Sequence, residues 1–216
     1  MASYRLVASV LILLTSCLGQ DIGGVDSRVA PLLVMNVLRE AHVSGSLEYW
    51  GRCGPGVWEP DVPKVRTLPD YSGSPREVLQ RMFADDRKMR VTQEPAGIIR
   101  MVETDVPNDL LDVKITHISF RAHAPSNVAN GANSALIIIL SAPEVKAFMK
   151  AHNIGPPADT WPAPSNSGSG RRAYGELNDV TVAQALDYVL QIFPGIWIYQ
   201  NCTSEEGGRE VRFNFY

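Results

Sequence analysis

The chain has 216 residues, 45% apolar and 20% charged, which is the composition of a globular protein with a buried core and excludes wholesale disorder. Its 20 basic and 23 acidic residues give a formal charge of −3, so we expect no nucleic-acid partner. Three cysteines are too few for a small fold held together by disulfides.

The N-terminal segment has the pattern of an export signal. Arg5 is the only charged residue before Asp21, and the apolar run over residues 6–14 follows it. Such a run is shorter than the ~20 residues that cross a bilayer, and it is typical of the apolar part of a signal peptide. We expect a signal peptide over residues 1–19 and a periplasmic or secreted protein.

Two cleavage sites fit this signal. Residues 14–17, Leu-Thr-Ser-Cys, resemble the lipobox of bacterial lipoproteins, in which Cys17 would carry the lipid and tether the protein to the outer membrane. Alternatively, the small residues Cys17 and Gly19 permit ordinary cleavage before Gln20. Thr-Ser is a loose lipobox, which favours the ordinary cut.

An oxidising compartment permits a disulfide between the two remaining cysteines, Cys53 and Cys202. Sequence spacing alone does not bring two cysteines within the ~6 Å Cα separation that a disulfide needs. The sequence therefore leaves both a bridge and two separate thiols open.

In the first half, apolar residues at three- and four-residue intervals predict a helix over residues 29–42. Strands are expected at 47–50 and 62–68, with a loop from Arg52 to Pro63. The clearest start signal is Ser74-Pro75-Arg76-Glu77, a capping box with proline at the first helical position. A hairpin over residues 89–102 follows the helix that it opens.

In the second half, β-branched residues predict a strand at 111–118, and the apolar run at 135–140 predicts a central strand. Ser141 to Glu144 reads as a second capping box. Residues 155–172, rich in proline, glycine and serine, predict a long surface loop. A further capping box begins at Thr181, and a hairpin closes the chain, its last strand alternating as a candidate sheet edge at 210–216.

The two halves echo each other. A shift of 107 residues places Ser74 on Thr181 and Glu77 on Gln184, and a hairpin follows both helices. A shift of 110 aligns His42 with His152, each after the preceding helix. We therefore predict an α+β fold of two small repeated units, each with two helices packed on a small mixed or antiparallel sheet. The units would span residues 20–108 and 109–216.

This order of elements resembles the secretin and TonB short N-terminal (STN) domain, in which a helix, a strand, a capped helix and a closing hairpin follow one another. The matching segments are residues 29–42, 47–50, 65–68, 74–83 and 89–102, and residues 175–216 repeat the later part. The chain departs from the family in its long loop at 155–172 and in lacking a following barrel or pore domain. The resemblance implies a cell-envelope interaction module that binds a protein partner.

Signatures of enzyme chemistry are missing from the sequence. It contains no Gly-x-Ser-x-Gly elbow, His-Glu-x-x-His, Cys-x-x-Cys, Gly-x-Gly-x-x-Gly or phosphate loop. His117 and His123 would share a strand face, with Asp112 nearby, but two imidazoles need a further ligand to hold a metal. The acidic pairs at 85–86 and 205–206 lie in expected turns. We predict no enzyme, no cofactor and no metal.

Four aromatic residues are candidates for partner binding, because exposed aromatic side chains anchor interfaces. They are Trp50, Trp58, Tyr71 and Trp161. The alternative is that they cover the ends of small cores. The favoured function is thus an exported, non-enzymatic interaction module whose only membrane contact would be a lipid on Cys17. The alternative is an exported hydrolase with a dispersed site of residues such as Asp112, His117 and Ser119.

Overall fold

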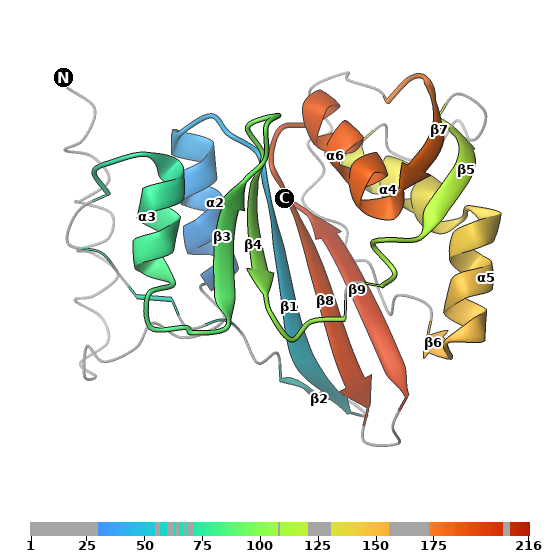
Figure 1. The fold of residues 1–216 in the computed structure, drawn as a ribbon, viewed down its shortest axis with the longest axis horizontal. Helices are drawn as coiled ribbons and strands as arrows, with labels where there is room; N and C mark the ends of the chain where they lie inside the picture. The colour runs from blue at the N-terminus through green and yellow to red at the C-terminus, as the bar shows by residue number, and fades with distance from the viewer. Residues whose placement is uncertain are drawn as a thin grey trace.

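The computed structural model describes residues 30–54, 57–59, 63, 65–66, 68, 71–107, 109–120, 131–155, 173–204 and 208–216. The expected signal peptide, Cys17 and nearly all of the expected loop at 155–172 lie outside these residues. The α+β class is confirmed: a seven-stranded mixed sheet and a small two-stranded antiparallel sheet are flanked by helices (Figure 1).

The first half begins with a helix and a long strand and continues with a capped helix and a hairpin. Its elements are α2 (Ala30–Glu40), β1 (Gly45–Gly54), β2 (Val57–Glu59), α3 (Pro75–Met82), β3 (Met89–Gln93) and β4 (Ile99–Glu103). The capping box of α3 is confirmed, because the Ser74 hydroxyl accepts from the Glu77 amide and the Glu77 carboxylate accepts from the Ser74 amide.

The second half adds a small separate sheet and one further helix to a similar succession. Its elements are β5 (Lys114–Ser119), α4 (Ala132–Leu140), α5 (Pro143–Ala151), β6 (Ile154–Gly155), β7 (Glu176–Thr181), α6 (Val182–Ile192), β8 (Ile196–Ser204) and β9 (Arg209–Phe215). The predicted box at Thr181 is confirmed by reciprocal hydrogen bonds with Gln184.

The large sheet joins both halves. Its order is β3-β4-β1-β8-β9-β6, β2 pairs with β1, and β5 and β7 form the small sheet. Strand β1 is parallel to β4 on one side and to β8 on the other, and the β1–β8 ladder runs from Gly45↔Ile196 to Cys53↔Ser204. The strands of the two predicted units therefore form one continuous sheet.

Two hydrophobic cores lie on opposite faces of this sheet, and β8 contributes to both. Ile196 and Ile198 belong to the first core with α2 and α3. Trp197 and Tyr199 belong to the second core with α4, α5 and α6. Successive side chains of a strand point to opposite faces, so this one central strand links the two cores.

The two halves share a pattern of pairing. Strand β1 lies parallel beside β4, and β6 lies parallel beside β9; the following hairpins, β3–β4 and β8–β9, are antiparallel. His42 and Asn153 end the turns after α2 and α5 with φ of 55° and 50°. Strands β6, β8 and β9 run opposite to their counterparts β1, β3 and β4, and the helices of the second half lie on the other face of the sheet. A 180° rotation about an axis in the sheet plane, perpendicular to the strands, produces both of these changes. The duplication itself stays a prediction, because β5, α4 and β7 have no counterpart in the first half.

The expected central strand at 135–140 is wrong, because these residues form α4. A continuous apolar run fits a buried helix as well as a buried strand. Here the buried positions, Ala135, Leu136 and Ile139, follow helical spacing, and Ile137 is 51% exposed.

Three further local predictions need correction. The second capping box is absent: α5 has Ala142 as its N-cap without a side-chain hydrogen bond, and only Pro143 marks its start. The expected strand at 62–68 is not found among the described residues of that range. The loop expected from Arg52 begins later, because β1 pairs with β2 and β8 and extends to Gly54.

In the described part of the chain, no single helix is long and apolar enough to cross a membrane. Helices α4 and α5 pass that test only as a pair bent by 62°.

Candidate functional site

One edge of the large sheet is β3, whose one strand neighbour among the described residues is β4. The amide of Thr104 donates to the Lys88 carbonyl, and the amide of Glu94 donates to the Ile98 carbonyl. In an antiparallel pair, inward-bonding positions alternate along the strand. The backbone groups of Met89, Val91 and Gln93 therefore point away from β4.

The side chains of β3 divide between two environments. Met89 and Val91 are buried in the first core, whereas Arg90, Thr92 and Gln93 are exposed. The Val91 carbonyl, on the outer edge, accepts a hydrogen bond from Gln80 Nε2 of α3 at 3.4 Å. The edge thus lies directly beside α3.

A shallow groove of about 440 Å³ lies on this side of the molecule, along the outer surface of α3. It is lined by Ser72, Glu77, Gln80, Arg81 and Ala84. We call it the α3 groove. Because Gln80 both lines the groove and reaches Val91, the groove and the β3 edge form one continuous surface.

Cations gather at the start of β3, and they differ in their partners. Lys88 Nζ lies 3.1 Å from Asp105 and 3.8 Å from Glu103. Arg66 forms an exposed ion pair with Asp85. Arg87 and Arg90 are exposed and have no partner in the described part of the chain. Within the described residues, the edge therefore places two guanidinium groups without a carboxylate partner beside outward backbone groups, of which the Met89 amide already donates to the Asp86 carbonyl.

A second cluster lies on the opposite face of β4 and β1, where Arg100 gathers three carboxylates. Its guanidinium forms an ion pair with Asp187 of α6 and lies 3.3 Å from Glu94 and 3.8 Å from Glu48. It also lies 5.8 Å from the ring centroid of Trp197, whose Nε1 donates to Asp187 at 3.4 Å. This cluster fastens a helix of the second half to strands of the first.

Burial changes the acidity of this cluster. It raises the pKa of Glu48, only 4% exposed, to about 7, although Arg100 and the Ser46 hydroxyl oppose the shift. Burial also raises the pKa of Asp187, again against the effect of Arg100. Each buried carboxyl has a structural partner, so the cluster serves as a link between elements rather than as an acid–base pair.

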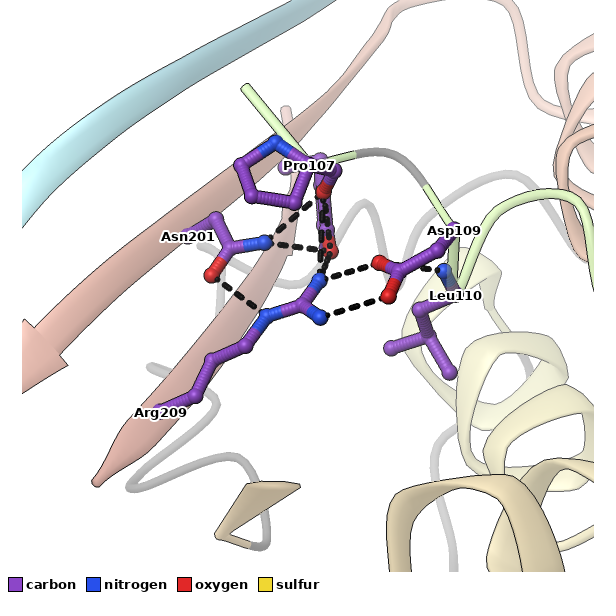
Figure 2. Close-up of polar contacts among 6 residues, drawn as sticks. Pro107, Asp109, Leu110, Asn201 and Arg209 are labelled. Carbon is purple, nitrogen blue, oxygen red and sulfur yellow. Dashed lines mark hydrogen bonds and ion pairs between the residues drawn. The ribbon is translucent and has the colours of Figure 1, made fainter. Parts of the chain in front are cut away.

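A third cluster, shown in Figure 2, links the segment before β5 to β8 and β9. Arg209 holds Asp109 with both guanidinium Nη atoms and donates from Nε to Asn201 Oδ1 at 3.0 Å. The amide of Asn201 donates to the Pro107 carbonyl at 2.8 Å. Burial raises the pKa of Tyr199, whose hydroxyl joins the same network, to about 12. The polar side chains of this part-buried corner bond mainly to one another and to the Pro107 carbonyl, which indicates a structural role.

Two of the four aromatic candidates can be placed. Trp50 is half-buried against the second core, and Tyr71 is half-buried against the first. Both cover cores, which was the alternative to partner binding. The side chain of Trp58 and all of Trp161 lie outside the described residues, so a binding role for these two stays a prediction.

The histidines that the structure describes have separate partners. His117 Nδ1 of β5 lies 2.8 Å from Asn178 Oδ1 of β7, its cross-strand neighbour, on an exposed surface. His152, the C-cap of α5, stacks on Phe148 at 4.1 Å. His123 lies outside the described residues. Among the residues described, no group of three or more His, Cys, Asp or Glu side chains is placed to hold a metal.

Cys202 is buried in β8 and forms a disulfide. The side chain of Cys53 is not among those that the structure describes. Its backbone lies on the neighbouring strand β1, where Cys53 is opposite Ser204 and Gly51 is opposite Cys202. The pairing of these two cysteines remains our prediction.

Intact-mass spectrometry of the natively exported protein tests this pairing and the cleavage site together. We expect cleavage before Gln20 and a mass two hydrogens below that of the reduced chain, with Cys53 and Cys202 joined in the non-reduced peptide map. A lipid mass on Cys17 would contradict the ordinary cleavage. Alkylation of Cys53 without prior reduction would exclude the bridge.

Sequence reasoning missed both the β3 edge and the Arg100 cluster. The hairpin at 89–102 was predicted, but sheet order, which decides which strand is an edge, is not visible in one sequence. The candidate edge at 210–216 is partly covered, since β6 pairs with Arg209 and Glu210 of β9. Alternation of Ser46, Glu48 and Trp50 was the one available signal for a polar sheet face.

Comparison with known proteins found no matching family model, no similar curated protein and no similar solved structure. The proposals below therefore rest on the chain's own residues.

Proposed function

We propose that this protein is an exported, non-enzymatic interaction module of the cell envelope, which binds a protein partner by strand addition at the β3 edge. The observation that carries the proposal is the outward-facing backbone of Met89, Val91 and Gln93 on a strand that ends the sheet. Extended segments bind such edges through main-chain hydrogen bonds. The export signal and the STN resemblance support the envelope location.

Strand addition suits this edge for a further physical reason. An unpaired strand edge invites non-specific pairing, and proteins commonly protect it with charges or a covering element. Here the charges are cations at the start of the strand. The Met89 amide already donates to the Asp86 carbonyl, and among the described residues the other contact to the outward groups is one long hydrogen bond from Gln80 to Val91. A partner strand can replace that contact and gain several backbone bonds.

Site-specific photo-crosslinking in the cells that make the protein tests this function. A photoreactive phenylalanine analogue replaces Thr92 or Gln93, both exposed on β3, and in the control it replaces the exposed Lys146 of α5. We expect a discrete protein adduct from both β3 positions and none from Lys146. Adducts of equal yield at all three positions, or none at β3, would refute binding at this edge.

A further inference from the structure

The charges beside β3 indicate what kind of segment the edge receives. Arg87 and Arg90 are exposed without a carboxylate partner in the described residues, whereas Lys88 already lies near Glu103 and Asp105. Arg90 points to the sheet face opposite α3, because its neighbours Met89 and Val91 are buried on the α3 side. A cation at this position favours an opposite charge directly across the strand pair.

The other face of an added strand would meet different chemistry. Its side chains opposite Met89 and Val91 would lie over the α3 groove, where Gln80 and Ala84 are among the lining residues. Glu77 in this groove is already held by the capping box, and its pKa is lowered by the Ser74 amide and hydroxyl. This side therefore suits small apolar side chains rather than a second row of acids.

Resting on the proposed function, we propose that the β3 edge binds an extended segment as an antiparallel strand, with acidic side chains facing Arg90 and small apolar side chains facing α3. The antiparallel direction follows from the greater stability of antiparallel pairs per residue. In this arrangement the apolar residues of the segment direct their amides and carbonyls to Met89, Val91 and Gln93. The acidic residues direct theirs to solvent.

A fluorescently labelled peptide, acetyl-Thr-Glu-Val-Glu-Val-Glu-Thr-amide, tests both the charge and the geometry through fluorescence anisotropy. We expect it to bind, and the same peptide with lysine in place of glutamate to bind at least ~10-fold more weakly at low ionic strength. N-methylation of the valines removes the donors that face β3 and should abolish binding. N-methylation of the glutamates should leave most of the affinity.

Charge reversal on the protein gives the matched test. In R87E/R90E the preference should invert, so that the lysine peptide binds more tightly than the glutamate peptide, while K146E on α5 should behave like the parent protein. Circular dichroism of each variant checks that the fold is retained.

The outcomes separate this inference from the proposed function. If the glutamate and lysine peptides bind equally, or R87E/R90E has no effect, the acidic specificity is wrong, while crosslinking at Thr92 and Gln93 still decides the binding edge. If the two N-methylated peptides lose affinity equally, or only the N-methyl-glutamate peptide does, antiparallel strand addition is wrong.

Discussion

Replacing Arg100 with methionine is expected to lower the free energy of unfolding by about 3–5 kcal/mol at pH 8, since removing one partner of a buried ion pair leaves uncompensated charge. Arg100 is 17% exposed and faces Glu48 and Asp187, which are 5% and 17% exposed at the side chain. Methionine retains much of the packing volume, so the loss reports mainly on the carboxylates.

The effect should depend on pH, with a sign fixed by the raised pKa of Glu48. Its pKa rises from 4.5 to about 7 on folding, so the folded state binds the proton more tightly. The tighter proton binding of Glu48 contributes up to about 3 kcal/mol to the free energy of unfolding. This contribution is fully present below about pH 4.5 and is lost as the pH rises to about 7. Without Arg100 the carboxyls of Glu48 and Asp187 should remain protonated to higher pH, so Arg100→Met should cost less at pH 5 than at pH 8.

Urea unfolding at both pH values measures this difference. The control is Arg66→Met, which breaks an exposed pair with Asp85 whose side chains are 47% and 58% accessible. Such a pair contributes less than ~1 kcal/mol at either pH. Equal losses in the two variants, or a loss at Arg100 that is the same at pH 5 and pH 8, would show that the Arg100 cluster is not desolvated as described.

Local signals predicted the structure correctly at two of the three expected capping boxes, whereas the box expected at Ser141 is absent. The boxes at Ser74 and Thr181 need only four residues to satisfy two amides, so they predicted the starts of α3 and α6. The hairpins after both helices follow from the same kind of short-range pattern. The α+β class was predictable from these elements together.

Long-range features were not predictable in this way. The run at 135–140 became a helix because the helical conformation buries Leu136 and Ile139 in a core supplied by distant strands. Glu48 looks like an ordinary exposed strand residue until α6 covers it, and β3 becomes an edge only through the order of the sheet. Such facts depend on pairings between segments as far apart as Ser46 and Trp197, which nothing in the local sequence specifies.

Truncation of Trp197 to alanine is expected to destabilise the protein by about 3–5 kcal/mol, the usual cost of deleting a buried aromatic side chain. Trp197 is fully buried in the second core, and its Nε1 donates to Asp187. Trp197→Phe keeps most of the volume and removes the donor, so it should cost clearly less. Equal costs would mean that the hydrogen bond, and not the packing, dominates this position.

The same residue tests whether the two cores form one cooperative unit. Ile198, the residue directly after Trp197 in β8, faces the first core on the opposite side of the sheet. Since one strand carries both side chains, Trp197→Ala and Ile198→Ala should each shift a single urea transition, coincident by circular dichroism and by tryptophan fluorescence. Two separate transitions in either variant would show that the halves unfold independently and that β8 does not bind them into one domain.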